Sequence, residues 1–411
     1  MLRVQLWSYN YDPEPQGIAP LSAMLAGELQ RRGHDVLVVA AHPHYPEPHW
    51  GFRLKPYRER RDGVSVMRLP LWIGRDSGLQ RMRQEFSFAA AQSTVAPLLP
   101  PCDAIIAVTP CFPALLPAMV TAKVRRIPWL IWLQDIVTDG AVTTGLLDES
   151  SLGLRLARQA EVIAHSSAAR TIAVSDAFRG NLVAKGIPAE RIERIFNPSS
   201  RHTDAPNDLA ALAAEPPQIL VMGNIGHSQG LEHIVDAFEG SEALRALDAT
   251  LTIAGGGVAA GAVRERITSD AVRMPGVLYG SELEPVLRSA SLGLVSQRAD
   301  VAEFNLPSKL MNYMAYGIPV LASVRIGSET GRIVEESGCG WVTDAAHPEQ
   351  FAETAARVLQ DREALVRAGA AGFAFAREHF HPSSVAARFE QVLQQVIGPP
   401  AAAVRNGSTG A

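Results

Sequence analysis

One loop near the start of the sequence has the composition of an anion-binding turn. In "NYDPEPQGIAPLSAMLAGELQRRGHDV", from Asn10, three prolines and a glycine separate an apolar strand from an amphipathic helix. The loop therefore brings the backbone N–H groups of a helix start to the end of a strand. Helix N-termini favour anions, and Gly17 lets a ligand approach the backbone closely. An ordinary strand-to-helix turn explains the same residues, and the G-x-G-x-x-G fingerprint of dinucleotide-binding proteins is absent.

Polar and charged side chains follow apolar strands at several later points. "VMGNIGHSQGLEHIVDAF", from Val221, reads as a strand, a glycine-flanked turn and a helix. In "NLPSKLMNYMAYGIPVLAS", from Asn305, a Pro-Ser-Lys begins a helix that ends at Gly317 before another buried strand. "GSETGRIVEESGCGWV" follows from Gly327, and "WLIWLQDIVTDG" ends a buried strand with two aspartates. Whether these groups meet depends on the elements that carry them.

The bulk composition indicates a soluble protein with large cores. The chain has 411 residues, of which 47% are hydrophobic, and this length predicts two or three domains. The net charge of −4 argues against nucleic acid as the main partner. The three cysteines, an odd count without short-spaced pairs, indicate neither a disulfide framework nor a zinc site. The first strand begins near residue 2 and no apolar run approaches the ~20 residues of a membrane span, so we expect a cytoplasmic protein.

Short apolar runs alternate with helical patterns along the chain, which predicts an α/β fold of parallel sheets with right-handed crossovers. The segment from Asn197 to Gln218 is rich in proline and aspartate and is the predicted linker. We expect a first doubly wound domain at 1–200 and a second at 218–380, with ligands at the carboxyl ends of the strands in a cleft. A helix at about 381–397 is expected to pack back on the first domain, and 398–411 is expected to be a disordered tail. Predicted strands begin at Arg3, Val36, Val64, Ala104, Trp129 and Thr171 and, in the second domain, at Ile219, Leu251, Gly276, Leu292 and Pro319.

Taken in order, these segments resemble the GT-B glycosyltransferases of family 4. The nearest likeness is to the colanic-acid and fucosamine-type branch, which makes bacterial surface polysaccharides. It runs from Arg3 to roughly Phe380 and includes "RTIAVSDAFRGNLVAKGIPAERIERIFNP" from Arg170. The resemblance implies retaining transfer of a hexosyl or N-acetylhexosaminyl group from a UDP- or GDP-linked sugar to an acceptor hydroxyl, with no cofactor and no obligatory metal. The sequence contains no D-x-D triplet, so backbone N–H groups, helix dipoles and fixed cations would stabilise the departing diphosphate.

The resemblance also implies which residues hold the donor, and here the chain departs from the family pattern. Many members carry an arginine and a lysine where this chain has Asn224 and Gln229, which leaves Lys309 as the main candidate for positive charge. The second glutamate of the family's pair falls at Asn312, an amide that bonds a ribose hydroxyl less strongly than a carboxylate does. Ser308 is expected to cap its helix or to touch a phosphate. The implied donor-binding set is Gly17, Gly223, Asn224, Gly226, Gln229, Gly230, Gly255, Gly280, Ser308, Lys309, Asn312 and Glu329, and a surface position is the alternative for Glu329.

The acceptor is expected on the first domain. Asp135 resembles the branch's Gln-Asp segment and is the predicted group that activates or orients the acceptor hydroxyl, together with Lys309 in the catalytic set. Its alternative is a helix N-cap, and a donor phosphate oxygen is an alternative base. Thr109 stands where many relatives carry a histidine. Asp139, His42 and His44 are expected on the acceptor side, while metal binding by His42, His44 and His49 is the weaker interpretation because no Cys or acidic ligand set accompanies them.

A basic segment suggests contact with a membrane surface. Between Arg53 and Arg83 nine cations stand against three acids, whereas the whole chain is net negative. Anionic lipid attracts each nearby cation by ~1 kcal/mol, so the segment would bring the first domain to a lipid-linked acceptor on the inner face of the cell membrane. A solvated surface is the alternative.

Two other functions remain open from the sequence. A sugar-nucleotide epimerase of the same fold would need acid and base groups around one sugar. A non-catalytic scaffold of the same fold is suggested by the amides at Asn224, Gln229 and Asn312. The base, sugar, linkage and acceptor are not readable from the residues.

Overall fold

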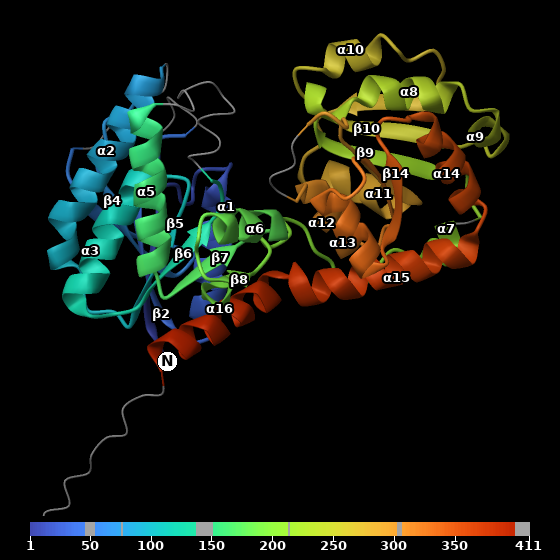
Figure 1. Ribbon diagram of the computed structural model, residues 1–411. Helices are drawn as coiled ribbons and strands as arrows, with labels where there is room; N and C mark the ends of the chain where they lie inside the picture. Colours follow the sequence, from blue (N-terminus) through green and yellow to red (C-terminus); the bar gives the residue numbers. More distant parts are fainter. Residues whose placement is uncertain (46–53, 75–76, 137–150, 213, 302–305, 399–411) are drawn as a thin grey trace, which may run out of the picture. The chain divides into compact units, whose positions relative to one another are not determined.

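The computed structural model describes residues 1–45, 54–74, 77–136, 151–212, 214–301 and 306–398 (Figure 1). The chain divides into two compact units. The first unit comprises Met1–Asn197 and Val385–Ala411, and the second unit comprises Pro198–Ser384. The first segment of the first unit thus ends at Asn197, the residue where the predicted linker begins. Almost all of the predicted tail, 399–411, lies outside the described residues.

The first unit is built on an eight-stranded sheet in the order β3-β4-β2-β1-β5-β6-β7-β8. Its pairs are parallel except that β3 is antiparallel to β4. The strands are β1 (Arg3–Ser8), β2 (Asp35–Ala41), β3 (Tyr57–Arg61), β4 (Val64–Leu69), β5 (Ala104–Val108), β6 (Trp129–Leu133), β7 (Arg170–Ala173) and β8 (Ile192–Arg194). Two of them were not predicted: β3 is a charged edge strand without an apolar run, and β8 has only three residues.

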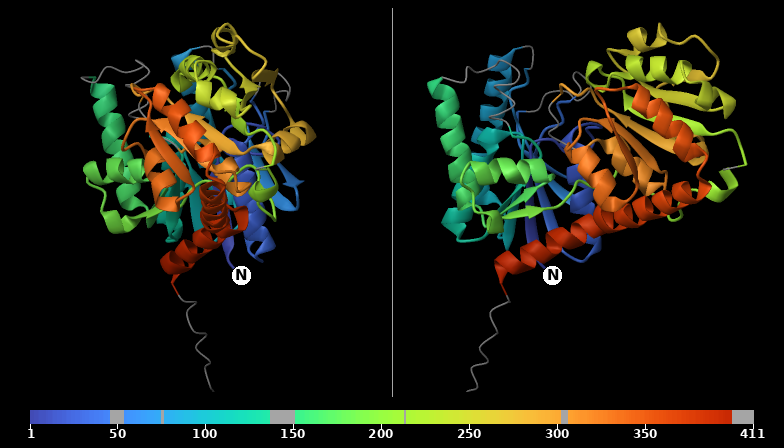
Figure 2. Two further views of the ribbon diagram at one scale, coloured as in Figure 1. Left: turned by 90° about the vertical axis from the view of Figure 1, so that its right-hand side faces the viewer. Right: turned by 45° about the vertical axis from the view of Figure 1, so that its right-hand side comes forward.

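Helices cover both faces of this sheet (Figures 1 and 2). Side chains along each strand alternate between the faces, so Val4 and Leu6 of β1 join one core while Trp7 joins the other. The first core includes residues of α1 (Ile18–Arg31), α6 (Asp176–Ala184) and α16 (Pro382–Ile397). The second includes residues of α2 (Gly78–Val95), α3 (Leu115–Arg125) and α5 (Leu152–Ser167). Phe389 of α16 packs edge-on against Trp132, so the last helix belongs to the core of the first unit.

The second unit has a six-stranded, fully parallel sheet in the order β11-β10-β9-β12-β13-β14. Residues of α8, α9, α10 and α14 join the core on one face, while α12 packs on the other face beside α15. The strands are β9 (Gln218–Asn224), β10 (Thr250–Gly256), β11 (Val272–Gly276), β12 (Leu292–Ser296), β13 (Val320–Val324) and β14 (Gly340–Asp344). The helices are α7 (Leu209–Leu212), α8 (Leu231–Glu239), α9 (Glu242–Ala246), α10 (Ala260–Arg264), α11 (Leu283–Ser289), α12 (Ser308–Ala315), α13 (Glu329–Ser337), α14 (Glu349–Leu359) and α15 (Arg362–His379).

The predicted fold class of two doubly wound parallel α/β domains is confirmed. The strand predicted from Gly276 is misplaced, because β11 ends at that residue. Gly276 has a φ of 88°, which a strand does not continue through, and Pro275 is tolerated because β11 is an edge strand. Within the described residues, none of the helices combines the length and the apolar character that crossing a membrane requires.

Candidate active site

The sheet of the second unit opens between β9 and β12, where its strand order reverses. These two strands pair only at Ile219–Leu292 and Leu220–Gly293. Beyond that point the hydroxyl of Tyr313, on α12, accepts from the backbone N–H of Met222 and donates to the carbonyl of Leu220, both at 3.0 Å. Parallel α/β sheets bind ligands in the crevice at such a switch point. By this rule, a ligand of this sheet is expected at the carboxyl ends of β9 and β12.

Gly293 makes this arrangement possible. A Cβ at that position would lie 2.6 Å from the ring of Tyr313. Only glycine therefore lets the tyrosine lie flat against β12 and reach the backbone of β9. The buried hydroxyl is hydrogen-bonded twice, and burial raises its pKa far above the ordinary value of 10.0, so it stays a neutral structural group.

A turn after β9 is held in place from the β12 side. Gly223 and Gly230 have φ values of 100° and 58°, which glycine adopts without steric cost. The hydroxyl of Ser296 donates to the carbonyl of Gln229 at 2.6 Å, and the N–H of Arg298 donates to the carbonyl of Ser228 at 2.8 Å. The turn that carries Asn224, Gly226 and Gln229 is therefore fixed before any ligand arrives.

Lys309 reaches the same turn from the start of α12. Its ammonium donates to the Oε1 of Gln229 at 2.9 Å, and the amide nitrogen of Gln229 donates to the carbonyl of Asn224. Only 9% of Lys309 is exposed to solvent, and this burial lowers its pKa from 10.5 to about 8. Within the described ranges no carboxylate pairs with it. A cation buried without a carboxylate is costly, and a bound anion would relieve that cost.

Two more predicted donor residues lie on helices that follow β12 and β13. Asn312 is buried on α12, and its Oδ1 accepts from the hydroxyl of Ser200 at 3.2 Å. Glu329 is the first residue of α13, with Ser328 as N-cap, and it forms an ion pair of 3.0 Å with Arg332. Only 9% of Glu329 is exposed, so the alternative of a surface glutamate is wrong.

Ser308 does not cap α12. It is the first helical residue and is exposed, while Pro307 occupies the cap position and no side chain makes a capping hydrogen bond. The capping alternative is therefore wrong, and phosphate contact stays a prediction.

Gly255 is needed for the packing of β10 against β9, since a Cβ there would lie 1.8 Å from the carbonyl oxygen of Gly223. Gly280 begins a short turn after β11, two strands away from β9, and is not brought together with Lys309.

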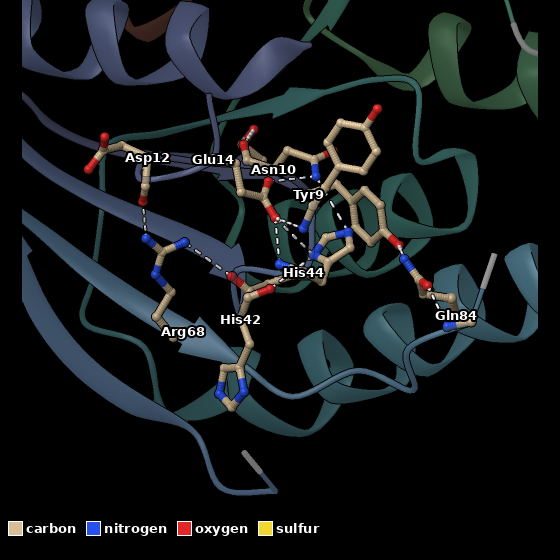
Figure 3. A network of polar contacts seen from close by, with 12 residues as sticks. Tyr9, Asn10, Asp12, Glu14, His42, His44, Arg68 and Gln84 are labelled. Atoms are coloured by element: carbon tan, nitrogen blue, oxygen red, sulfur yellow. Dashed lines mark hydrogen bonds and ion pairs between the residues drawn. The ribbon is translucent and has the colours of Figure 1, made fainter. Parts of the chain in front are cut away.

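The first unit carries a buried polar network after β1 and β2 (Figure 3). Glu14 accepts from the backbone N–H groups of His44 and Tyr45, at 2.7 and 3.1 Å, and from the side-chain amide of Asn10 at 2.7 Å. The imidazole of His44 lies 3.2 Å from the same carboxylate. Glu14 was missed by the sequence reading, although a lone acid between two prolines of a rigid loop is a detectable signal.

The predicted acceptor-side histidines are both buried in this region. Only 3% of His42 and 1% of His44 are exposed, and the ring of His42 packs against that of Tyr57. Their role toward an acceptor stays a prediction. Asp139 and His49 lie outside the described residues. Gly17 directly precedes α1 and has a φ of 66°, which glycine adopts more readily than other residues, and its contact with an anion stays a prediction.

Asp135 lies at the carboxyl end of β6, beside Thr109 at the end of β5. The hydroxyl of Thr109 accepts from the N–H of Gln134 at 2.8 Å and lies 3.4 Å from the N–H of Asp135. The side-chain amides of Gln134 and Asn197 exchange two hydrogen bonds of 2.7 and 2.8 Å. Asp135 itself is exposed, yet neighbouring protein atoms desolvate its carboxyl and raise its pKa. The residues that would test the helix-cap alternative, 137–150, are outside the described part.

One member of the predicted basic segment is not available to a partner. Arg68 is fully buried, and its guanidinium donates to the carbonyl of Asp12 (Figure 3). It also donates to the carbonyl of Ala41 and to Glu59, at 3.1 and 2.8 Å. The guanidinium lies over the ring of Tyr11. Its charge stabilises the loop after β1. Among the described residues of the segment, the exposed cations are Lys55, Arg58, Arg60, Arg81 and Arg83, while Arg53 and Arg75 lie outside the described residues.

Comparison with known proteins assigns the two units. Residues 16–198 match a glycosyl transferase 4-like domain, and residues 216–361 match the glycosyl transferases group 1 domain. WcaI of Escherichia coli K12, whose name assigns it to colanic acid biosynthesis as a glycosyl transferase, is 26% identical over 359 residues, or 81% of this chain and 86% of WcaI.

Solved structures agree in fold along nearly the whole chain. Anabaena HepE in complex with UDP-glucose has a TM-score of 0.64 at 16% identity and covers 96% of this chain and 100% of HepE. Sucrose-phosphate synthase from Thermosynechococcus elongatus has a TM-score of 0.68 at 16% identity, with 96% and 99% covered. With two consecutive domain matches and this fold, the chain belongs to the GT-B glycosyltransferases of family 4.

Proposed function

We propose that this glycosyltransferase moves a hexosyl or N-acetylhexosaminyl group from a UDP- or GDP-linked sugar to an acceptor hydroxyl, with retention of configuration and without a bound metal. The second unit would bind the donor and the first unit the acceptor. The biosynthesis of a bacterial surface polysaccharide or glycoconjugate is the proposed setting, because WcaI is named for such a process. HepE, in complex with UDP-glucose, supports a nucleotide-sugar donor for the shared fold.

The observation that carries this proposal is the buried ammonium of Lys309 at the switch point. It is held by Gln229 at 2.9 Å and has no carboxylate partner among the described residues. A nucleoside diphosphate would supply the missing negative charge. The glycine turn after β9 and the first turn of α12 would add backbone dipoles on the same side of the sheet.

The proposed reaction uses these groups to stabilise the leaving group. As the bond between the anomeric carbon and the diphosphate oxygen breaks, the acceptor oxygen bonds to that carbon on the same face. The acceptor proton passes to a diphosphate oxygen, and the nucleoside diphosphate leaves. Lys309 would neutralise the developing charge on the diphosphate. The lysine would not have to move during the reaction, because Gln229 already holds its ammonium in position. Asp135 would orient the acceptor hydroxyl, while Asn312 and Glu329 would bond hydroxyls of the donor.

A nucleotide-sugar panel tests the proposal. Purified full-length protein would be incubated with UDP- and GDP-linked hexoses and N-acetylhexosamines in EDTA, and both thermal shift and nucleoside diphosphate release would be measured. We expect one donor to stabilise the protein and to release its diphosphate when a lipid-linked saccharide extract is supplied. Stabilisation by no member of the panel, or release only after Mg²⁺ is added, would contradict the proposal. The anomeric proton coupling of the product, measured by NMR, tests retention.

The non-catalytic alternative has its own signature. Amides at Asn224, Gln229 and Asn312 supply dipoles where many relatives carry charge, and this is the observation that favours it. A scaffold protein would bind a donor without turnover, and Asp135→Asn would change nothing. The proposed enzyme instead loses diphosphate release in Asp135→Asn while its donor-induced thermal shift is kept.

A further inference from the structure

A pair of side-chain amides joins the end of β6 to the segment that follows β8. The amide nitrogen of Gln134 donates to the Oδ1 of Asn197 at 2.8 Å, and the amide nitrogen of Asn197 donates to the Oε1 of Gln134 at 2.7 Å. Gln134 comes directly after β6, Asn197 comes three positions after β8, and β7 lies between these strands. The pair therefore spans the carboxyl end of β7, at the edge of the sheet where Asp135 lies.

The backbone around Asn197 is fixed by its neighbours. Ile195 and Phe196, which precede it, are buried, and the N–H of Ile195 donates to the carbonyl of Ala173 at 3.0 Å. Pro198 follows, and a proline disfavours the helical conformation of the residue before it. Asn197 therefore presents its amide to Gln134 from a well-defined position.

The direction of the Asp135 carboxyl group depends on these contacts. Within the described ranges, no side chain binds this carboxyl group, and the hydroxyl of Thr109 lies 3.4 Å from the N–H and 3.5 Å from the carbonyl oxygen of Asp135. Thr109 also accepts from the N–H of Gln134 at 2.8 Å. The backbone at the end of β6 is thus held from the β5 side by Thr109 and from the β8 side by Asn197. This backbone sets where the carboxyl group points.

We propose that Gln134 is a positioning residue for Asp135, and that its amide pair with Asn197 directs the Asp135 carboxylate toward the acceptor hydroxyl. Two apolar side chains would fill the same space without fixing a direction, whereas two hydrogen bonds between planar amides fix both distance and direction. Gln134 is buried, so it acts through Asp135 and does not bind the acceptor itself. The inference rests on the proposed function, because it assigns the placement of the group that would orient the acceptor.

Crystal structures of ligand-free variants test the positioning without any activity. Gln134→Ala removes the pair, Gln134→Asn leaves it one methylene too short, and Gln134→Asn/Asn197→Gln restores the summed length of the two side chains. We expect the Asp135 carboxyl group to move by about 1 Å in both single variants, a displacement large enough to impair a reaction, and to return in the double variant. An Asp135 carboxyl group that superposes on its wild-type position in Gln134→Ala would overturn the inference.

Turnover measures the consequence for the reaction. Release of nucleoside diphosphate is followed with the donor that stabilises the wild type and with the lipid-linked saccharide extract. We expect Gln134→Ala to lower kcat by about ten- to hundredfold and to change the KM for the donor by less than about twofold, because only the acceptor side is misplaced. Gln134→Asn/Asn197→Gln should recover at least about half of the wild-type kcat, since it rebuilds the pair.

A double-mutant cycle shows whether the two amides act as one unit. Gln134→Ala and Asn197→Ala each remove the pair, so combining them should lower kcat by less than about twofold beyond the slower single variant. Losses that multiply in the double variant would overturn the inference. Gln30→Ala is the matched control, because it removes a 2.9 Å amide hydrogen bond to the carbonyl of Gly63 in the same unit, and it should keep the wild-type kcat. A wild type that releases no diphosphate would count against the proposed function alone, because the crystal structures decide the position of Asp135 without it.

Discussion

The ammonium of Lys309 donates a 2.9 Å hydrogen bond to the Oε1 of Gln229 and thereby joins the start of α12 to the turn after β9. The two residues are 80 positions apart, and the bond spans the opening between β9 and β12. It holds a cation at the switch point of the sheet, where a neutral amide is its partner. The surroundings of this lysine therefore favour an anionic ligand.

Replacing Lys309 should stabilise the protein while removing donor binding. Burial lowers the lysine pKa from 10.5 to about 8, so below pH 8 the folded state carries the cost of a desolvated charge. In Lys309→Met that cost disappears, and we expect the free energy of unfolding at pH 7 to rise by about 1–2 kcal/mol after the lost hydrogen bond is subtracted. Urea unfolding measures the gain in stability, and calorimetry measures binding of UDP or GDP, whichever belongs to the donor that stabilises the protein. Lys55→Met, at an exposed lysine, is the control and should change neither quantity.

Donor affinity should fall as the pH rises above 8. The pKa of Lys309 in the free protein is about 8, and a bound diphosphate would raise it, so binding takes up a proton in alkaline solution. Below pH 7 the lysine is protonated in both states and its contribution is constant. We expect the dissociation constant for UDP or GDP, whichever belongs to the donor that stabilises the protein, to increase up to about tenfold per pH unit between pH 8 and 9.5 in EDTA. A flat profile across that range would remove Lys309 from the diphosphate site.

The order of elements was readable from the sequence because buried parallel strands are continuous apolar runs, as β2 and β6 are. Lys309 was predicted because the family resemblance left it as the main candidate for positive charge, and the Pro-Ser-Lys pattern correctly placed it at a helix start. Glu14 was missed because its partners, His44 and Tyr45, lie 30 and 31 positions away.

Burial of charge was also invisible in the sequence. Arg68 belongs to a basic run, yet Glu59 and two carbonyl oxygens accept from it inside the fold. Apolar residues at helical spacing on α2, α3 and α5, such as Met82, Val120 and Leu156, look like ordinary core positions in the sequence. Only the packing of these helices shows that the three side chains are exposed. Exposure and partner choice are tertiary properties, so a pattern along the chain does not determine them.

Two glycines of the second unit should respond oppositely to the same substitution. At Gly255 a Cβ would lie 1.8 Å from the carbonyl oxygen of Gly223, so Gly255→Ala must push β10 away from β9. We expect it to lower the melting temperature strongly or to prevent soluble expression. At Gly261, inside α10, a Cβ meets nothing within 4 Å, and Gly261→Ala should raise stability by about 0.5–1 kcal/mol. Equal effects of the two variants in differential scanning calorimetry would contradict the packing of β9 on β10.

The carboxylate of Glu14 should contribute to the stability of the first unit. It accepts from two backbone N–H groups and from Asn10, and hydrogen bonds to a charged group are worth about 1.5–3 kcal/mol each. Glu14→Gln keeps the shape and one acceptor oxygen but turns an N–H donor toward a group that already donates. We expect the free energy of unfolding to fall by about 2 kcal/mol, since one favourable contact becomes unfavourable.

Tryptophan fluorescence during urea unfolding reports mainly on the first unit, because Trp341 is the one tryptophan outside residues 1–197. It therefore measures the expected loss of stability in the unit that contains Glu14. Glu190→Gln, at an exposed position of the same unit, is the matched control. If Glu14→Gln unfolds at the same urea concentration as this control, the network in Figure 3 does not hold the loop after β1. If the variant is destabilised but its donor-induced thermal shift is kept, the network supports the first unit without contributing to the donor site.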